Sequence, residues 1–222
     1  MTRVVLQNIK NYEDKEYRRF RDMVSAAKRE RIDRYKHIVD YRRSLLGDVL
    51  SRSLLAKMTS MDVVELDICV DDMGKPYMAN AENTFFNISH SGEYVACIVS
   101  DKPCGIDIEI IGHDNRDIAK RFFAKSEYEY ITDYPKDETR RRFYEIWTAK
   151  EAYSKYEGKG LGIDFDSFEV VKKENNFYVF VDGIQKHIVN VRDTVDGYML
   201  SFLCEDEGEI SVETEYGDLY EL

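Results

Sequence analysis

The charged segment that ends at Gly158 most constrains the fold of this chain, because it follows the last of three prolines and contains neither proline nor glycine. We predict one long helix here. Within it, Trp147, Glu151 and Lys155 recur every four residues and therefore lie along one face, with Lys150 beside them. One carboxylate would then lie among ammonium groups. A solvated face with ordinary salt links remains the alternative to a catalytic site.

Length and composition indicate a globular protein with a substantial core. The chain has 222 residues, of which 43% are hydrophobic, so we expect one compact unit. The four cysteines form no Cys-x-x-Cys pair and lie mostly in apolar runs, which favours buried thiols over zinc ligands or disulfides. No stretch has the apolar length of a signal peptide core or a membrane span. We therefore expect a cytoplasmic protein that does not bind a membrane.

The net charge of −11 argues against a general nucleic-acid-binding protein, but the charge is unevenly spread. From Lys28 to Arg43 there are seven basic residues against three acidic ones, and this segment could anchor phosphate or form a solvated helix face. The tail from Glu205 to Leu222 has eight acidic residues and no basic one, which is typical of a solubilising terminus.

Hydrophobic periodicity predicts a mixture of helices and short strands. We expect helices over residues 13–37, 41–57, 114–123 and 127–134 besides the long one, with Asp40 as the N-cap of the second and Ser126 with Glu129 as a capping box. We expect strands over residues 4–9, 63–70, 85–89, 94–99, 105–111, 168–171, 177–181, 187–191 and 198–203.

The strand from Gly105 to Ile111 carries two carboxylates on one face. Strand alternation places Asp107 and Glu109 together and their isoleucine neighbours on the opposite face. Adjacent carboxylates repel, and either free solvent or a hard divalent cation such as Mg²⁺ relieves that repulsion. An exposed sheet face stays open as the alternative, and a metal site would require a third ligand.

Two further places could contact a ligand. Ser44 lies on the first turns of its predicted helix, where backbone donors favour anions. Ser89 and His90 lie where a strand runs out towards the Ser91-Gly92 turn. Neighbouring residues on a strand point to opposite faces, so this cluster does not predict a hydrolase, and a lone histidine here is more often structural.

Taken together, these motifs resemble the Sfp-type 4'-phosphopantetheinyl transferases. The resemblance rests on motifs that appear in the family's order, namely Gly74-Lys75-Pro76, Phe86 to Ser91, Gly105 to Glu109, Arg121-Phe122-Phe123 and Trp147 to Lys155, with Lys28 and Leu45 to Leu50 extending it towards the N-terminus. It implies an α+β fold of two similar halves with pseudo-twofold symmetry, residues 1–103 and 104–222. Each half would pack a helix on a small, mostly antiparallel sheet, with the ligand cleft between the halves.

The resemblance also implies a set of site residues. The magnesium ligands would be Asp107, Glu109 and Glu151. Coenzyme A contacts would come from Lys28, Arg31, Ser44, Lys75, Ser89, His90, Asp107, Lys150 and Lys155. Arginine at position 31, where the family often has lysine, keeps the charge and adds a fork for phosphate.

The implied reaction transfers 4'-phosphopantetheine from coenzyme A to a serine of an apo acyl or peptidyl carrier protein, as in fatty acid, polyketide or nonribosomal peptide synthesis, and releases adenosine 3',5'-bisphosphate. Lys155 and Lys150 would stabilise developing negative charge, and Glu151 or else Glu127 would accept the serine proton. The carrier would dock near Gly158 to Ile188, where apolar residues include Leu161, Ile163 and Phe165. The family analogy suggests a monomer.

Two other functions use the same residues. One is a magnesium-dependent nucleotide phosphohydrolase, and the other is a module that binds coenzyme A or a carrier protein without catalysis. Turnover of coenzyme A with and without an apo carrier separates the three.

Overall fold

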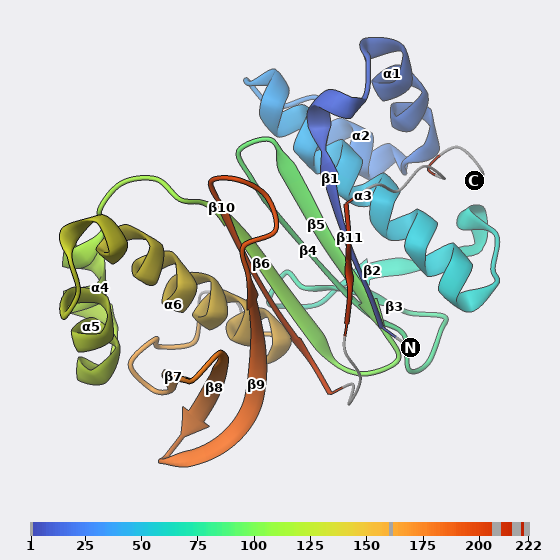
Figure 1. Ribbon diagram of the computed structural model, residues 1–222. Coiled ribbons are helices and arrows are strands. Elements are labelled where there is room, and N and C mark those ends of the chain that lie inside the picture. The colour runs from blue at the N-terminus through green and yellow to red at the C-terminus, as the bar shows by residue number, and fades with distance from the viewer. Residues whose placement is uncertain (1, 160–161, 206–209, 215–218, 220–222) are drawn as a thin grey trace. The chain divides into compact units, whose positions relative to one another are not determined.

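The computed structural model describes residues 2–159, 162–205, 210–214 and 219. The chain forms two compact units, one of Met1–Asp71, Pro76–Lys102 and Asp206–Leu222, and one of Asp72–Lys75 and Pro103–Glu205 (Figure 1). Each unit combines a long helix with a mostly antiparallel sheet, which confirms the predicted α+β class.

The sheet of the first unit has the strand order β11-β1-β5-β4. Its strands are β1 (Thr2–Asn8), β4 (Phe85–Ser91), β5 (Tyr94–Ser100) and β11 (Val212–Glu213). β5 pairs antiparallel with both β1 and β4, whereas β11 pairs parallel with β1 through Val4↔Val212 and Val5↔Glu213. The predicted strands over 4–9, 85–89 and 94–99 are therefore confirmed, and β11 was not predicted.

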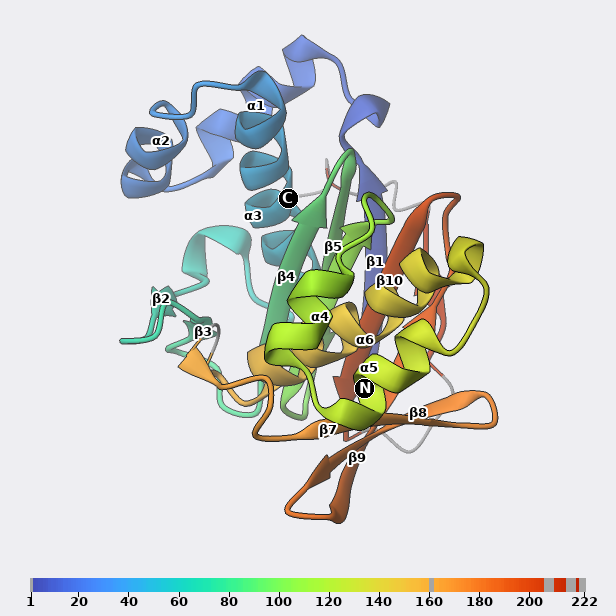
Figure 2. The same ribbon diagram turned by 90° about the vertical axis from the view of Figure 1, so that its left-hand side faces the viewer.

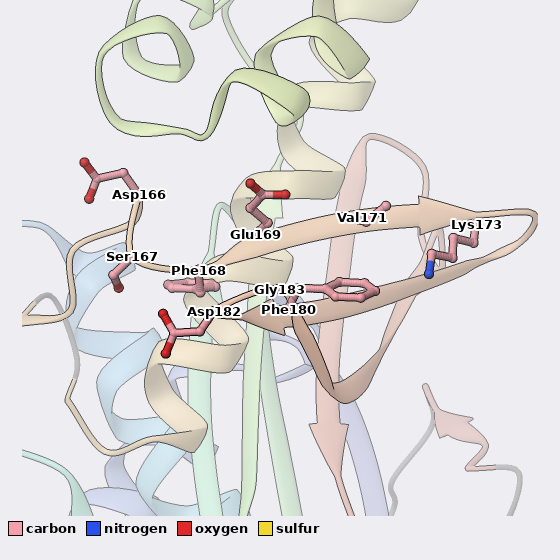
Figure 3. A pocket seen from close by; sticks show the side chains of 9 residues that line it. All are labelled: Asp166, Ser167, Phe168, Glu169, Val171, Lys173, Phe180, Asp182 and Gly183. Carbon is pink, nitrogen blue, oxygen red and sulfur yellow. The ribbon is translucent and has the colours of Figure 1, made fainter.

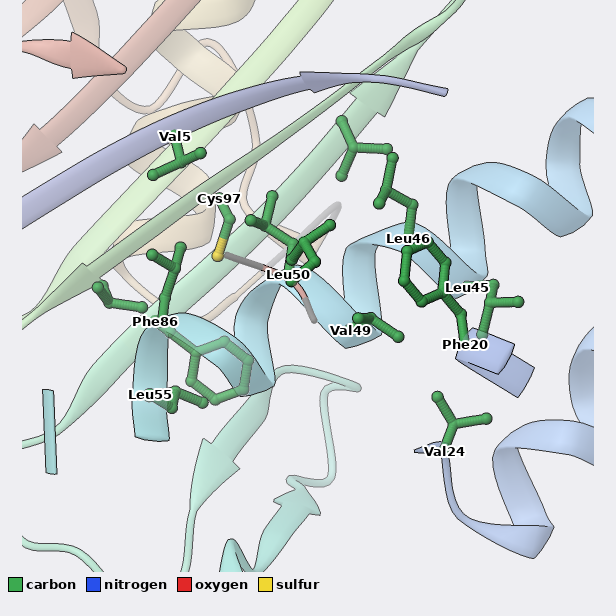
Figure 4. Close-up of a cluster of buried hydrophobic side chains, with 14 of the residues drawn as sticks. Val5, Phe20, Val24, Leu45, Leu46, Val49, Leu50, Leu55, Phe86 and Cys97 are labelled. Atoms are coloured by element: carbon green, nitrogen blue, oxygen red, sulfur yellow. The ribbon is translucent and has the colours of Figure 1, made fainter. Parts of the chain in front are cut away.

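Helix α3 (Ile38–Thr59) lies against this sheet and supplies much of the first core. Its leucines and valine at positions 45, 46, 49 and 50 are at most 1% exposed and pack with residues of the sheet, such as Val5 and Cys97 (Figure 4). The helix starts before Asp40, with His37 as its N-cap, so the prediction that Asp40 is the N-cap is wrong. Asp40 instead pairs with Arg43 within the helix.

The helix predicted over residues 13–37 is interrupted. It forms α1 (Asp14–Met23) and α2 (Ala26–Ile32), separated by extended backbone at Val24 and Ser25. The Ser25 hydroxyl accepts a hydrogen bond from the Lys28 N–H at 3.2 Å and so caps α2. The buried Val24 between the helices keeps the helical spacing of apolar residues across the break, which is why periodicity alone did not reveal it.

The strand predicted over 63–70 is only partly formed. Val63–Glu65 is a 3-10 turn, and only β2 (Ile68–Val70) is extended, pairing with the short β3 (Pro76–Met78). Another 3-10 turn, Ile9–Asn11, follows β1.

The sheet of the second unit has the order β6-β10-β9-β8-β7. Its strands are β6 (Cys104–Ile110), β7 (Glu169–Lys173), β8 (Asn176–Val181), β9 (Ile184–Arg192) and β10 (Tyr198–Cys204). The long helix α6 (Lys136–Tyr156) packs on β6 and β10, and α4 (Arg116–Phe122) and α5 (Lys125–Thr132) lie beside α6 (Figure 2). Each of these elements corresponds to a predicted one within a few residues.

The start of α5 differs from the prediction. The helix begins at Lys125, and the Glu127 carboxylate accepts a hydrogen bond from the Ala124 N–H at 2.8 Å. The capping side chain is therefore Glu127, and Ser126 is already inside the first turn.

The acidic tail is more than a solubilising terminus in its described part. Glu213 of β11 holds Arg3 of β1 with two hydrogen bonds of 2.8 and 3.0 Å, and Leu219 is fully buried in the first core. Nothing in residues 2–159, 162–205, 210–214 and 219 forms a helix long and apolar enough to cross a membrane. All four cysteines are free, with Cys97 and Cys104 buried and Cys69 and Cys204 half-buried.

Candidate functional site

The carboxylate-bearing face of β6 lies against α6. Gly105 makes this approach possible, because a Cβ atom there would lie 2.1 Å from the Ala152 carbonyl oxygen and 2.6 Å from the Tyr156 nitrogen. Residues two apart on a strand share a face, so Asp107 faces the same helix. The glycine itself was the only local signal of this close approach in the sequence.

Lys155 and Asp107 form the central contact of the site. The Lys155 ammonium lies 2.6 Å from Asp107 Oδ1, and the Asp107 side chain is only 4% exposed. Lys155 is the last lysine of α6, whereas Asp107 is in the middle of β6. Two motifs that are far apart in the sequence therefore meet within the second unit.

Glu151 lies one helical turn before Lys155 and joins the same group. Burial raises its pKa from 4.5 to about 7, and the negative charges of Asp107 and Glu109 add to the shift while Lys155 opposes it. The three predicted carboxylates thus influence one another electrostatically. A carboxyl group with a pKa near neutral can exchange a proton at physiological pH.

The group is not a ready-made metal cage. Among residues 2–159, 162–205, 210–214 and 219, no three histidines, cysteines, aspartates or glutamates are arranged closely enough to hold a metal ion. In this structure the positive charge beside Asp107 is the ammonium group of Lys155.

Lys150 and Glu127 have a different environment from the one predicted for them. They form an ion pair of 2.7 Å, and both side chains are 0% exposed. Lys150 also donates to the carbonyl oxygens of Phe165 and Phe168, at 2.6 and 2.8 Å. Glu127 accepts from the Val170 N–H at 2.6 Å besides its bond at Ala124. Burial lowers the pKa of Lys150 and raises that of Glu127, and each partner opposes the shift.

Because neither side chain has exposed surface, this arrangement does not support direct contact of Lys150 with substrate or proton transfer by Glu127. Their bonds join α5, α6 and the start of β7 in this structure, and the roles predicted for them stay predictions. The sequence showed the lysine next to Glu151 but not the buried acceptors that surround it.

Lys75 points to the end of α6. Its ammonium donates to the carbonyl oxygens of Lys155 and Tyr156, at 2.5 and 3.1 Å. The structure therefore places this predicted coenzyme A contact at the helix terminus that carries Lys155.

The first unit carries its own group of predicted residues. Lys28 lies 3.8 Å from Asp48 Oδ1, and Asp48 also accepts a hydrogen bond of 2.7 Å from Arg52. Burial lowers the pKa of Lys28, whereas Asp48 opposes the shift. Ser44 and Arg31 both hydrogen-bond the Tyr35 hydroxyl, which lowers the pKa of Tyr35.

Sequence reasoning missed Tyr35, Asp48 and Arg52. The spacing of Asp48 and Arg52, four residues apart on one helix, was the available signal.

Ser89 and His90 occupy neighbouring positions on β4, opposite Ala96 and Val95 of β5. Ser89 is buried and His90 is exposed, which confirms that they point to opposite faces. The first unit thus presents a basic group on α2 and α3, and a separate pair on β4.

The segment predicted to receive a carrier protein includes β7 and β8. Leu161 lies outside the described residues, whereas Ile163 and Phe165 pack against the second core. A pocket of about 480 Å³ opens here (Figure 3), lined by Asp166, Ser167, Phe168, Glu169, Val171, Lys173, Phe180, Asp182 and Gly183. Three carboxylates against one ammonium group do not favour a phosphate ligand in this pocket.

Trp147 is a packing residue. Its ring lies 5.7 Å from that of Phe143 and 5.6 Å from that of Phe165, within the second core. The helix face that begins with Trp147 is therefore apolar at one end and charged at the other.

Comparisons with known proteins identify the family of the chain. The model of the 4'-phosphopantetheinyl transferase superfamily matches residues 103–203, and a model of the N-terminal part of 4'-phosphopantetheinyl transferase matches residues 11–102. The chain is 42% identical to 4'-phosphopantetheinyl transferase Sfp of Bacillus subtilis (strain 168) over 70% of its own length and 69% of that protein.

Two further relatives have the same activity in their names. A 4'-phosphopantetheinyl transferase of Bacillus subtilis is 38% identical over 80% of both chains. The 4'-phosphopantetheinyl transferase gsp of Aneurinibacillus migulanus is 33% identical over 80% of this chain and 75% of that one. All of the carboxylates and lysines grouped between β6 and α6 fall inside the matched region, and the chain belongs to the Sfp-type 4'-phosphopantetheinyl transferases.

Proposed function

We propose that this protein transfers the 4'-phosphopantetheine group of coenzyme A to a serine hydroxyl of an apo acyl or peptidyl carrier protein and releases adenosine 3',5'-bisphosphate. The observation that carries the proposal is the contact of Lys155 with Asp107 beside Glu151, within a chain that belongs to this family. A transfer at the pyrophosphate of coenzyme A requires groups that neutralise negative charge and one that accepts a proton.

Glu151 is the proposed base. With its pKa raised to about 7, Glu151 is still partly deprotonated at neutral pH, and its carboxylate is a stronger base than an ordinary one and can accept the serine proton. Lys155 is the proposed anion-binding group, since its side chain is 24% exposed while its charge is already directed at the site by Asp107. Glu127 and Lys150 have no direct role in this proposal because they are buried.

The donor set fits a hard divalent cation, and we propose Mg²⁺. Asp107, Glu109 and Glu151 offer carboxylate oxygens, the ligands that Mg²⁺ prefers, and the charges of Asp107 and Glu109 add to the burial that raises the pKa of Glu151. When bound, Mg²⁺ would polarise phosphate oxygens and neutralise their charge. Lys155 pairs with Asp107, and its ammonium would bind phosphate instead once a cation takes over that carboxylate.

The nucleotide part of coenzyme A is proposed to contact the basic group of the first unit. Lys28, Arg31 and Ser44 supply cationic and hydroxyl donors suited to phosphate, with Tyr35 connecting two of them. Ser89 and His90 are further candidates from the family resemblance.

The carrier protein is proposed to dock on the segment from Gly158 to Ile188. This segment exposes Ile184 and Ile188, at 59% and 52%, beyond the residues that pack in the core. The proposal also includes a monomeric state and a cytoplasmic location, where four free cysteines would stay reduced.

Incubation with coenzyme A, Mg²⁺ and a panel of apo carrier domains tests the proposal. We expect the intact mass of at least one carrier to increase by one phosphopantetheine group, with equimolar release of adenosine 3',5'-bisphosphate. Cleavage of coenzyme A without a carrier would instead indicate a phosphohydrolase. Binding of coenzyme A without turnover on any carrier would contradict the transferase.

A further inference from the structure

The loop from Asp72 to Lys75 lies against the end of α6. Gly74 adopts the left-handed backbone at φ +85°, and Pro76 begins β3, so Lys75 is held between two constrained positions. From there its ammonium reaches the carbonyl oxygens of Lys155 and Tyr156. These four loop residues belong to the second unit, although the residues on either side belong to the first.

Side-chain packing around the loop supports this placement. A Cβ atom on Gly158 would lie 3.6 Å from Lys75 Cδ, and one on Gly162 would lie 3.2 Å from Met73 Cε. The loop therefore contacts the residues that follow α6 as well as its last carbonyl groups. The methylene groups of Lys75 lie beside Gly158, and its ammonium group faces the end of α6.

The final carbonyl groups of a helix lack partners within the helix and carry the negative end of its dipole. The Lys155 oxygen also accepts from the Gly158 N–H at 3.2 Å, and a lysine that donates to the last two carbonyl oxygens adds to this bond and complements the dipole. Gly105 holds the same turn from the β6 side, where the Ala152 oxygen and the Tyr156 nitrogen lie too close for a Cβ atom. Lys155 thus projects from a turn that is fixed on two sides.

We propose that Lys75 is a positioning residue, whose ammonium caps α6 and so fixes the backbone from which Lys155 reaches the reacting phosphates. This inference rests on the function proposed above. It differs from the role implied by the family resemblance, in which Lys75 contacts coenzyme A itself. The two roles predict different effects on binding and turnover.

The decisive variant is Lys75→Met, which keeps the apolar stem and removes the ammonium group. We expect kcat to fall about ten-fold or more, because small misplacements of a catalytic group lower the rate steeply. The dissociation constant for coenzyme A, measured by calorimetry without a carrier, should stay within about two-fold of the wild-type value. Amide hydrogen exchange over residues 153–158 should become faster.

A second variant, Lys75→Gln, has a neutral amide that can still donate to a carbonyl oxygen. If Lys75 caps the helix, both the kcat and the amide exchange rate of Lys75→Gln should lie between those of the wild type and Lys75→Met. If Lys75 contacts phosphate instead, Lys75→Gln should behave like Lys75→Met, since both variants lack the positive charge. The matched control is Lys125→Met, which removes an 89% exposed lysine of the same unit and should change neither quantity.

An increase of about ten-fold or more in the coenzyme A dissociation constant, with unchanged exchange at the end of α6, would overturn the proposal in favour of direct contact. Unchanged kcat and exchange in Lys75→Met would overturn it too. If the wild-type protein modifies no carrier, the transferase proposal fails, whereas the exchange measurement still reports whether Lys75 caps the helix.

Discussion

Lys150 and Lys155 lie on the same helix five residues apart, yet their surroundings have almost nothing in common. Lys150 is fully buried and donates to two carbonyl oxygens and the Glu127 carboxylate, whereas Lys155 is partly exposed and faces Asp107. Five residues rotate a helix by about 140°, so the two ammonium groups leave α6 in different directions. The same helix therefore directs one lysine into the interior and the other to the predicted site.

The comparison teaches that neighbouring charges in a motif need not share a role. Both lysines pair with a buried acid, and the surroundings of the two acids differ as well. Glu127 is held by two backbone N–H groups, while Asp107 is surrounded by two further carboxylates. In the pair of Lys150 and Glu127, each charge has its partners nearby. Around Lys155, the carboxylates outnumber the ammonium group.

Lys150→Met should give the largest loss of stability. It leaves Glu127 buried without its cation, and breaking a buried ion pair typically lowers the free energy of unfolding by about 3–5 kcal/mol. Urea denaturation measures the loss. The double variant Lys150→Met/Glu127→Gln should recover part of it, and equal stability of the single variant and the wild type would contradict a structural role for Lys150.

Gly105→Ala should have the next largest effect. The added methyl group overlaps the α6 backbone, so helix and strand must separate, at a stability loss of about 1–3 kcal/mol. Transfer should fall sharply, because Lys155 and Asp107 lie on the two elements that move apart. Gly183→Ala is no suitable control because of its positive φ, but Ala119→Gly in α4 tests a helix away from this contact. If Gly105→Ala retains the wild-type transfer rate, the contact does not position the site.

Lys155→Met should lower stability by less, about 1–2 kcal/mol, because its ion pair remains partly exposed to solvent. Its transfer rate should nevertheless fall about a hundred-fold, since the group that neutralises phosphate charge is lost. Thermal unfolding and carrier modification are measured on the same preparation. A stability loss larger than that of Lys150→Met would reverse the comparison.

Glu151→Gln should produce the smallest effect on stability, visible as a pH dependence. A carboxyl group with its pKa raised from 4.5 to about 7 binds its proton more tightly in the folded state. Its contribution to stability is therefore fully present below pH 4.5 and is lost as the pH rises through about 7. Solvent screening reduces this contribution to about 1 kcal/mol.

The stability difference between the wild type and Glu151→Gln should consequently change between pH 5 and pH 8. The wild type should be less stable, relative to the variant, at pH 8 than at pH 5. Chemical denaturation at both pH values gives the difference. A difference that is independent of pH would show that Glu151 titrates near its ordinary pKa. Lys125→Met again serves as a surface control.

Much of the fold follows from periodicity. The extent of α6 and the strands on either side of it were predictable because apolar spacing and the turn at Gly158 are local signals. The break at Ser25 was not, because the cap depends on one hydroxyl in a segment that otherwise keeps helical spacing. The strand β11 was also missed, since a two-residue strand in an acidic tail has no pattern of its own.

The candidate site was only half predictable from the residues. Alternation correctly placed Asp107 and Glu109 on one face, but nothing local joined them to Glu151, which lies on another element. The family resemblance supplied that connection. It also suggested direct roles for Lys75, Lys150 and Glu127, whose side chains the structure directs to backbone carbonyls or to each other.

The pairing of β11 with β1 has a consequence for biosynthesis. The second unit is nested inside the sequence of the first, so ribosomes complete residues 103–205 before they make Val212 and Glu213. Until then, one edge of β1 lacks its pairing with β11, and Arg3 lacks its ion pair with Glu213. The sheet of the first unit is therefore the last part of the fold to gain all of its strands, and β11 closes an edge that could otherwise pair with another chain.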